Sequence, residues 1–573
     1  MQRLHHLLRT SIALAGLAAV LLGALPGIPA LASPRLQDEP PATLRIAMPP
    51  LTTLDPVQVS RFDPFTRDLV ENLFVGLTRY DPLTQQIEPM LAESWTVSED
   101  GLTWTFTLRQ DIPWVRYDPD SGEVVAVRPV VAGDFVYAIQ RACDPLRPSP
   151  ITANLMTIQG CQTVANAFPE VIDDLFIARE VGITATSPTT LEIRLLFPSA
   201  YFLTLTSTPE FRPLPREAVA SREATWTGAD TIITSGPYAL QGWDSNGLAL
   251  VRNPHWPDAV AGNVGAIEAV FTGESTTAPA LAARGAIDLA RLLPEEIAGA
   301  RQSAAGLLHS GPGSSLAVIG FSYDRALVDT PEVRRALSMA IDRQALTDQF
   351  LPGQALPAAS FTPPGMVATP QNTGVGFDPA QAQASFEAAG FPGCNNLPET
   401  LLVLVPSEDP TWSAIGQFIV EQWSANLGCH PALFEVRPLA RVLLIELSHA
   451  AYDTEKVTRS HMWYATWSAD YPDANAWIAD ALHCRYGYIR PGRACDETDA
   501  LLDQAAAESD PARRAELYAQ AEDRLFGPNG SFPVIPLYLT TSAWLQQPWL
   551  SGVNEYGPAR FDLWTIDTSQ QAG

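Results

Sequence analysis

Two carboxylates three residues apart, Asp470 and Asp473, are the first candidates for chemistry, because a pair of acids serves a glycosidase as proton donor and base. A chain with 63 acidic residues contains many such pairs by composition alone. The sequence has no Gly-x-Ser-x-Gly nucleophile motif and no His-Glu-x-x-His metalloprotease motif. Gly311-Pro312-Gly313-Ser314 has neither the length nor the lysine of a phosphate-binding loop. The sequence therefore predicts no catalytic residues, and a secreted hydrolase is the less favoured alternative.

Six cysteines are the next residues with chemistry of their own. In an exported chain they favour disulfides, and their grouping along the sequence predicts three pairs. The predicted pairs are Cys143 with Cys161, Cys394 with Cys429, and Cys484 with Cys495. A metal site is the rival interpretation, but no Cys-x-x-Cys and no His-x-x-x-His spacing accompanies the cysteines. Since the eight histidines are also scattered, we expect neither a metal nor a cofactor.

The net charge excludes one class of partner. The chain carries a formal charge of -27, and Lys456 is its only lysine. No cluster of arginines is present that would neutralise a row of phosphates, so nucleic-acid binding is not expected. The acidity is the pattern of a solvated surface that keeps an exported protein soluble.

The first residues have the pattern of a targeting signal. Arg3 and Arg9 form a basic start, 11–25 is a short apolar run, and Ala30-Leu31-Ala32 offers small residues for cleavage. This pattern predicts a signal peptide over 1–32. A retained membrane anchor is the alternative, although the apolar run is shorter than the roughly 20 residues that span a bilayer.

Export without a lipid anchor follows from the same region. The first cysteine is Cys143, so the lipobox cysteine of bacterial lipoproteins is missing after the apolar run. Removing 1–32 takes away two arginines and no acids, which changes the formal charge from -27 to -29. We expect the mature protein in the periplasm or at the exterior of the cell envelope, with a linker over 33–41 before the first lobe.

Length and periodicity indicate the elements that position these residues. A chain of 573 residues is long enough for two or three lobes. Residues 95–108 alternate apolar and polar side chains around the turn at Glu99-Asp100-Gly101, which predicts a hairpin with Trp95 and Trp104 in its core. Capping residues followed by proline predict three helix starts. They are Thr330-Pro331, Asp378-Pro379 and Asp510-Pro511.

A βαβ unit is predicted between the second and third of these helix starts. The apolar run 401–405 predicts a strand, a helix follows from about 412 to 426 with Gly428 as its stop, and 433–436 predicts the next strand. Alternating strand and helix signals favour mixed α/β lobes, so the predicted fold class is α/β.

The order of motifs along most of the chain resembles the extracellular solute-binding proteins of peptide and nickel ABC importers, the family that includes dipeptide- and oligopeptide-binding proteins. Each motif alone is weak, whereas the ordered series is specific. The series is Leu54-Asp55-Pro56, Phe74-Val75-Gly76-Leu77, 89–95, 100–106, Arg128-Pro129-Val130, Asp134-Phe135-Val136, Ser235-Gly236-Pro237-Tyr238, Arg252-Asn253-Pro254, Gly285-Ala286-Ile287-Asp288, 333–337, Ala340-Ile341-Asp342-Arg343 and 467–473.

The resemblance implies a two-lobed clamp like the periplasmic binding proteins, with mixed sheets and an extra subdomain in the first lobe. By analogy, 42–310 forms the first lobe and includes an inserted subdomain at about 81–205. The second lobe would be 311–535, and 536–573 would return to the first lobe. The chain would cross between lobes near 311–315 and near 534–539. Hinge closure of two such lobes is a recognised way to enclose a ligand.

The resemblance also implies the ligand site. In peptide-binding relatives, the aspartate of the motif matched by Ala469-Asp470-Tyr471 binds the ligand ammonium, so Asp470 is the expected partner of a peptide amino end. Trp467 would cover the peptide backbone or a side chain, and Tyr471 and Phe321 are further candidate ligand contacts. The alternative is structural: Asp470 caps a helix through Asp473 to Leu482, and Trp467 fills core.

Two departures from the family pattern bear on the ligand. Dipeptide-binding members carry an arginine where this chain has Pro410-Thr411-Trp412-Ser413, and relatives often have asparagine where Ser322 follows Phe321. The implied ligand is thus an oligopeptide, delivered by a monomeric binding protein to the permease membrane subunits of an ABC importer. A non-peptide solute such as a metal chelate or a glycoside is the alternative.

Overall fold

A computed structural model describes most of the chain after the expected signal peptide. The described residues are 41–60, 63–150, 152–273, 277–323, 325–371, 374–395, 397, 399–449, 460–489 and 492–571. The expected signal peptide, 1–32, and residues 33–40 of the expected linker lie outside them. Residues 41–573 cluster as one compact unit.

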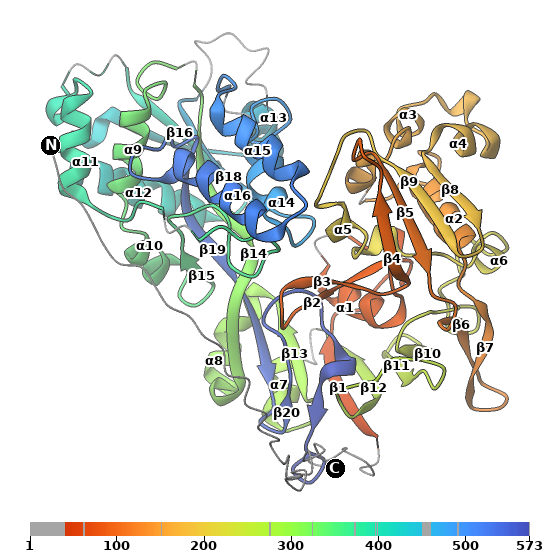
Figure 1. Ribbon diagram of the computed structural model, residues 1–573. Helices are drawn as coiled ribbons and strands as arrows, with labels where there is room; N and C mark the ends of the chain where they lie inside the picture. The colour runs from red at the N-terminus through yellow and green to blue at the C-terminus, as the bar shows by residue number, and fades with distance from the viewer. Residues whose placement is uncertain are drawn as a thin grey trace, which may run out of the picture. The chain divides into compact units, whose positions relative to one another are not determined.

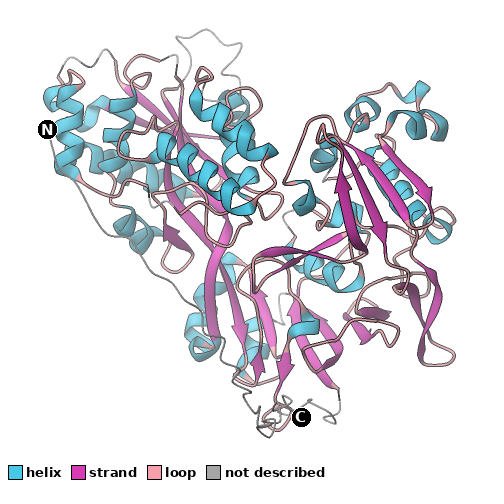
Figure 2. Ribbon diagram, viewed as in Figure 1, coloured by secondary structure: helices cyan, strands magenta, loops and turns pink. Residues whose placement is uncertain are grey.

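A large mixed sheet organises this unit (Figures 1 and 2). It has eleven strands in the described part of the chain. In spatial order, the strands are β10 (Tyr238–Trp243), β11 (Gly247–Arg252), β12 (Val264–Phe271), β1 (Ala42–Met48), β13 (Leu289–Leu292), β19 (Val534–Gln546), β14 (Leu308–Phe321), β18 (Met462–Ser468), β16 (Leu401–Pro406) and β17 (Phe434–Leu439), and β15 (Ala355–Pro357) pairs with β19 off this path.

Two long antiparallel strands, β14 and β19, connect the two ends of this sheet. Residues 543–546, at the C-terminal end of β19, pair with β13, and residues 315–321 of β14 pair with β18. The ladder between β14 and β19 is interrupted between Pro312 and Leu316, within the expected crossing at 311–315. On the other side, β1 runs parallel to β12 and β13, and β16 runs parallel to β17 and β18. The predicted α/β class is therefore confirmed.

Alternate side chains of β14 enter two different cores. Leu316 and Val318 pack in one hydrophobic cluster, whereas Ala317, Ile319 and Phe321 pack in another. This division follows from the twofold periodicity of a strand, which sends successive side chains to opposite faces. Helices therefore cover both faces of this part of the sheet, as Figure 2 shows.

The helices on these faces begin largely where the sequence predicts. Asp378 and Asp510 cap α11 and α16 by accepting backbone hydrogen bonds, and Pro331 opens α9. Proline suits a first turn because its missing N–H has no intrahelical partner there. The helices of this region are α9 (Pro331–Met339), α10 (Arg343–Phe350), α11 (Pro379–Ala388), α12 (Pro410–Leu427), α13 (Arg441–His449), α14 (Ala474–Leu482), α15 (Glu497–Ala507) and α16 (Pro511–Phe526).

The predicted βαβ unit is also confirmed. It consists of β16, α12 and β17, with the two strands parallel in direct register. Gly428 ends α12 in the left-handed conformation at φ 73°, which a glycine adopts without steric cost. The helix begins two residues earlier than expected, because Asp409 caps it and Pro410 occupies its first turn.

A second, four-stranded antiparallel sheet holds the predicted hairpin. Trp104 is buried in it as expected, whereas Trp95 is only half-buried. Its strands in spatial order are β4 (Ala92–Val97), β5 (Thr103–Leu108), β9 (Thr190–Arg194) and β8 (Ile183–Ser187). The helices α2 (Ala132–Cys143), α3 (Cys161–Ala165), α4 (Asp174–Glu180), α5 (Phe202–Leu205) and α6 (Arg216–Val219) and the hairpin of β6 (Pro113–Asp118) with β7 (Glu123–Pro129) belong to the same stretch of chain.

The helices and strands not yet named lie before and after the four-stranded sheet in the chain. They are α1 (Pro64–Leu73), β2 (Thr78–Asp81), β3 (Gln86–Pro89), α7 (Ala278–Ala283), α8 (Ile297–Ser303), β20 (Leu550–Ser551) and β21 (Thr565–Ile566). Along β19, Leu539 packs with α14 to α16, whereas Ala543 packs with α7 and α8. The strand thus changes cores over 540–542.

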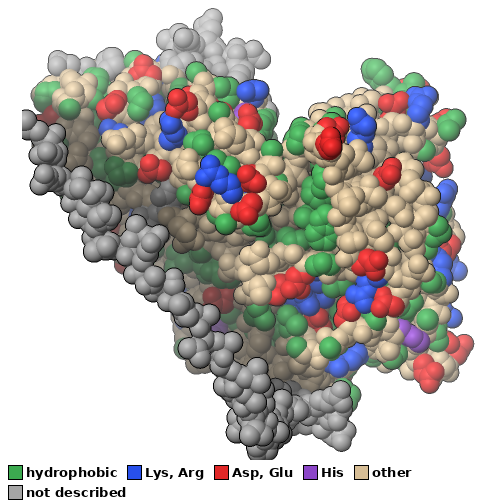
Figure 3. Space-filling model, viewed as in Figure 1, with side chains coloured by type: hydrophobic (Ala, Val, Ile, Leu, Met, Phe, Trp, Pro, Cys, Tyr) green, Lys and Arg blue, Asp and Glu red, His purple; other side chains and the backbone are tan. Residues whose placement is uncertain are grey.

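The surface agrees with an acidic, solvated protein. On the face drawn in Figure 3, acidic and basic side chains are interspersed. Among the described helices, none combines the length and the apolar character needed to cross a bilayer.

Candidate functional site

A cavity of about 230 Å³ lies beside the interrupted stretch of β14. Segments that are distant in sequence form its wall, including α1, the middle of β14 and β19, and the motif that contains Asp470. The lining residues are Pro64, Arg67, Asp68, Arg291, Pro312, Gly313, Ser314, Gly365, Met366, Ala469, Asp470, Tyr471, Pro472, Trp477, Ser542, Glu555, Tyr556, Gly557 and Pro558.

The structure brings two of the four predicted ligand residues to this cavity. Asp470 and Tyr471 both line it. Trp467 lies on β18, where its indole N–H donates to the carbonyl of Ala476 at 3.0 Å and its ring packs 5.5 Å from that of Tyr488. It is therefore engaged within its own part of the fold and does not line the cavity.

Phe321 lies away from the cavity. Its side chain is fully buried at the end of β14, in the cluster formed with α9 to α12, and the guanidinium of Arg334 lies 6.0 Å from its ring centre. The alternation of β14 explains this placement, since Phe321 shares a face with Ala317 and Ile319. We leave Phe321 out of the site on this ground.

Asp473, rather than Asp470, caps the helix that follows the motif. The Asp473 carboxylate accepts from the backbone N–H of Asn475 and precedes the first residue of α14. The structural alternative for Asp470, as the cap of this helix, is therefore wrong. A cap must stand directly before the first helical turn, and Asp470 stands three residues too early.

Asp473 is also committed to further contacts. It is fully buried, and Arg514 of α16 lies 2.5 Å from it. A carboxylate that caps a helix and forms a buried ion pair is unsuited to act also as a catalytic acid or base. The structural basis for a glycosidase pair of Asp470 and Asp473 is thereby removed.

The backbone around Asp470 is tied down as well. The N–H of Val367 donates to the carbonyl of Pro472, and the N–H of Ala474 donates to the carbonyl of Val367, each at 2.9 Å. These two bonds form a short parallel bridge between Val367 and Asp473. Asp470 thus sits on a segment whose C-terminal side is fixed by backbone pairing.

Tyr471 joins the motif to a buried polar network. Its hydroxyl donates to Asp480 at 2.8 Å and accepts from the amide of Asn475 at 2.9 Å. Desolvation, with the nearby charge of Asp480, raises the pKa of Tyr471 well above its ordinary value. Desolvation together with the charges of Asp470 and Asp473 raises the pKa of Asp480 to about 7, against the hydrogen bond from Tyr471, which lowers it.

The opposite wall is stabilised by an ion pair. Arg291 of β13 and Asp68 of α1 lie 2.6 Å apart, and Asp68 also accepts from the backbone N–H of Ala559 at 2.7 Å. The lining therefore has three carboxylates and two guanidinium groups, of which one of each neutralises the other in this pair. The formal balance of the wall is negative, which favours a cationic group on a ligand.

Two glycines allow close packing around the cavity. At Gly365, φ is +87° and an added Cβ would lie 2.3 Å from the ring of Tyr556, while the carbonyl of Gly365 accepts from the hydroxyl of Tyr80 at 2.8 Å. At Gly313, an added Cβ would lie 2.6 Å from the carbonyl oxygen of Thr540. Side chains at these positions would change the shape of the wall.

Several lining residues have no local sequence signal. Arg67, Arg291, Glu555 and Tyr556 belong to no recognisable motif, and only the folded chain brings them near Asp470. Arg67 lies four positions after Asp63, the capping residue of α1. The start of this helix was detectable from the sequence, whereas the place of the Arg67 side chain in the cavity wall was not.

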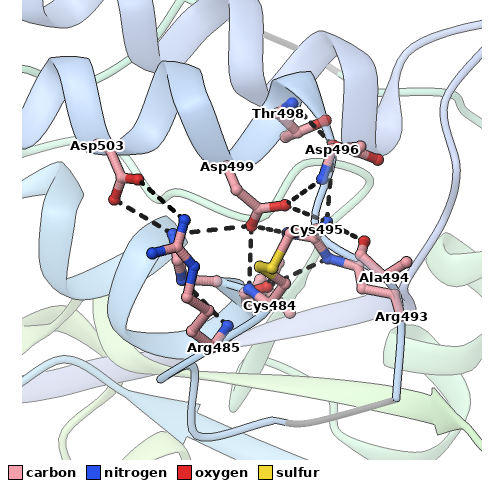
Figure 4. The surroundings of a disulfide bond; sticks show 11 residues. Cys484, Arg485, Arg493, Ala494, Cys495, Asp496, Thr498, Asp499 and Asp503 are labelled. Carbon is pink, nitrogen blue, oxygen red and sulfur yellow. Dashed lines mark hydrogen bonds and ion pairs between the residues drawn. A yellow bond between two sulfur atoms is a disulfide. The ribbon is translucent and has the colours of Figure 1, made fainter.

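All three predicted disulfides are present. They join Cys143 to Cys161, Cys394 to Cys429 and Cys484 to Cys495. Figure 4 shows the last of these, where Asp499 of α15 accepts from the N–H of Cys484 at 3.0 Å and pairs with Arg493. His483, Cys484 and Asp499 have potential metal-binding atoms close together, but the sulfur of Cys484 is committed to the disulfide.

Comparison with known proteins gives a family model and a set of relatives. The model described as bacterial extracellular solute-binding proteins, family 5, matches residues 86–488. The oligopeptide-binding protein OppA of Bacillus subtilis (strain 168) is 26% identical, over 86% of this chain and 86% of that protein. The probable deoxycholate-binding periplasmic protein YgiS of Escherichia coli (strain K12) is also 26% identical, over 89% of this chain and 93% of that protein.

A solved structure shares the fold. The periplasmic murein tripeptide binding protein MppA, in an unliganded open form, superimposes with a TM-score of 0.77 at 24% identity. The match covers 92% of this chain and 98% of that one. The expected two-lobed, mixed α/β fold is thereby confirmed.

Proposed function

Because the chain belongs to the bacterial extracellular solute-binding proteins of family 5, we propose that it captures peptides in the cavity beside Asp470. It then passes them unchanged to the permease membrane subunits of an ABC importer. The names of its relatives support peptides as the ligand class, since those relatives include oligopeptide-binding, dipeptide-binding and murein peptide-binding proteins.

One observation carries the proposal: Asp470 lies in the wall of a cavity whose lining is formally negative. A peptide brings an ammonium group at its amino end, and a charge-assisted hydrogen bond to a half-buried carboxylate is among the stronger polar contacts in proteins. Asp470 is thus the proposed partner of the ligand ammonium. Tyr471 provides the adjacent wall.

The backbone of the cavity offers a second kind of contact. Gly313 and Ser314 lie in the interrupted stretch of β14, between the pairs that Pro312 and Leu316 make with β19. An extended peptide that lies along this stretch pairs through its own amide groups, which gives affinity independent of side-chain identity. We therefore propose broad selectivity for peptide sequence.

The start of α12 bears on the length of the peptide. Trp412 occupies its first turn, and its ring packs 4.5 Å from that of Tyr464. This region has an indole where dipeptide-binding relatives provide a guanidinium for the ligand carboxylate. We propose that no fixed distance between the two peptide ends is imposed and that the ligands are oligopeptides.

The lobe boundaries and the location are part of the proposal. The expected return to the first lobe at 536 moves to 540–542, because Leu539 packs with α14 to α16 and Ala543 packs with α7 and α8. The first lobe is then 42–310 with 543–573, the second is 311–539, and the two close by a hinge. The change of core along β19 at 540–542 and the interruption of β14 support a flexible crossing there. The working form is a monomer, exported by a signal over 1–32 and released beyond the inner membrane.

Native mass spectrometry of the protein purified without denaturation tests this function. A mixture of peptide masses released on unfolding is the expected result, and the same peptides should raise the melting temperature when added back. A single non-peptide compound, such as a bile acid or a metal chelate, would contradict peptide capture. Conversion of the bound compound during incubation would instead indicate an enzyme.

A further inference from the structure

A short segment of the expected inserted subdomain packs against the part of the chain that carries Asp470. This segment, 199–206, contains α5. The backbone N–H of Ala200 donates to the carbonyl of Ala506 at 2.7 Å. The hydroxyl of Thr204 donates to the buried carboxylate of Asp473 at 3.1 Å. Residues separated by 269 and 306 positions in the sequence are thus joined by direct hydrogen bonds.

An aromatic pair strengthens the same contact. The rings of Tyr201 and Tyr471 stack with centroids 5.6 Å apart and planes 15° apart. Each residue is only 5% exposed, so both rings are shielded from water. Tyr471 consequently belongs to the hydrophobic core formed mainly by residues of 42–269, together with residues from the C-terminal part of the chain, although it follows β18.

These contacts hold the residues that directly follow Asp470. Tyr471 follows it directly, and Asp473 follows two residues later. The ring of Tyr471 is held by Tyr201 on one side, and its hydroxyl is held by Asp480 and Asn475 on the other. Asp473 receives Thr204 on one carboxylate oxygen and Arg514 on the other. Segment 469–473 is therefore fixed from both parts of the fold.

We infer that Tyr201 and Thr204 are positioning residues for the ligand site, which hold segment 469–473 so that Asp470 presents its carboxylate to the cavity. They raise affinity without touching the ligand, because a site that is ordered in advance loses less conformational entropy on binding. This inference rests on the proposed role of Asp470 in peptide capture. It assigns the inserted subdomain a part in ligand binding.

Substitutions that keep or remove each contact test the inference. Tyr201→Ala removes the ring and Tyr201→Phe keeps it, whereas Thr204→Val removes the donor and Thr204→Ser keeps it. The probe is an equimolar mixture of tripeptides to pentapeptides of mixed sequence, titrated by tryptophan fluorescence. We expect Tyr201→Ala and Thr204→Val to bind about 3- to 10-fold more weakly than the parent. The two conservative variants should bind within about twofold of it.

Hydrogen exchange provides a readout that needs no ligand. Amides at 471, 473 and 475 should exchange about tenfold faster in Tyr201→Ala, because the segment opens locally more often, and at the parental rate in Tyr201→Phe. The matched controls are Tyr137→Ala, where the ring lies under the guanidinium of Arg216, and Thr347→Val, where the buried hydroxyl bonds to the carbonyl of Arg343 in α10. Both controls should leave these amides unchanged.

The outcomes separate this inference from the proposed function. A parent protein that binds none of the probe peptides contradicts peptide capture, and the exchange rates alone then decide whether Tyr201 and Thr204 position the segment. A parent that binds, together with Tyr201→Ala and Thr204→Val variants of parental affinity and parental exchange, would overturn the inference. Equal losses in the Tyr137→Ala control would show general destabilisation and would also overturn it.

Discussion

Arg514 and Asp473 form a fully enclosed ion pair, with Nη2 of the arginine 2.5 Å from Oδ1 of the aspartate. Their side chains are 5% and 0% exposed. The pair joins α16 to the start of α14 and supports the segment that carries Asp470. The cost of removing one partner is the cost of leaving the other charge buried and unpaired.

Replacement of this arginine should therefore be strongly destabilising. Arg514→Met should lower the free energy of unfolding by about 3 to 5 kcal/mol, measured by urea denaturation. The matched control is the preceding residue, Arg513→Met, because Arg513 pairs with Glu516 on the exposed face of the same helix. That variant should change stability by about 0.5 kcal/mol or less. Equal effects at the two positions would contradict the assignment of a buried pair.

Glu522 should make stability fall as the pH rises from acid to neutral. It is 1% exposed, and its Oε1 accepts from the N–H groups of Phe361 and Thr362 at 2.7 and 2.9 Å. Burial raises its pKa from 4.5 to about 7, against those two bonds. The folded protein thus binds the proton more tightly, so the stabilisation is complete below pH 4.5 and is lost as the pH rises through about 7.

Glu522→Gln removes this titration. The free energy of unfolding, measured from pH 4 to pH 8, should decline less in the variant than in the parent. The difference between the two declines should be roughly 3 kcal/mol, at 1.36 kcal/mol per pKa unit. Glu516→Gln is the control, since Glu516 lies on the exposed face of the same helix. A Glu522→Gln variant with the parental pH slope would show that the Glu522 carboxyl has the same pKa in the folded and the unfolded protein.

The three disulfides should rank in their contribution to stability by the length of the loop that each one closes. The sequence separations are 11, 18 and 35 residues for the bridges at Cys484, Cys143 and Cys394. A chain-entropy account gives losses of about 2.8, 3.2 and 3.8 kcal/mol when each bridge is replaced by two serines. Thermal unfolding of the three double variants checks this order. A reversed order would mean that native packing, rather than loop closure, determines the contributions.

Much of the fold could be predicted because its signals are local. Asp510 with Pro511 sets the start of a helix within one turn, and the stop at Gly428 depends on a single left-handed residue. The three disulfides were predictable because neighbours in sequence were also partners in space.

The site was less predictable because its contacts are distant in sequence. Thr204 and Arg514 reach Asp473 from 269 and 41 residues away, and no pattern near either residue indicates this. Phe321 was proposed as a ligand contact, whereas the strand periodicity of 316–321 places its side chain in the core with Ile319. Asp473 was identifiable as the helix cap, since it directly precedes α14.

Affinity for one peptide with a free or an acetylated amino end, measured with the parent and with Asp470→Asn, tests the central claim most directly. The parent should bind the free peptide more tightly than the acetylated one by about 1.5 to 3 kcal/mol, the range for a hydrogen bond to a charged group. Asp470→Asn should lose most of that difference and keep the parental melting temperature. A variant that still discriminates between the two peptides as the parent does would contradict the role of Asp470 and the peptide-binding account built on it.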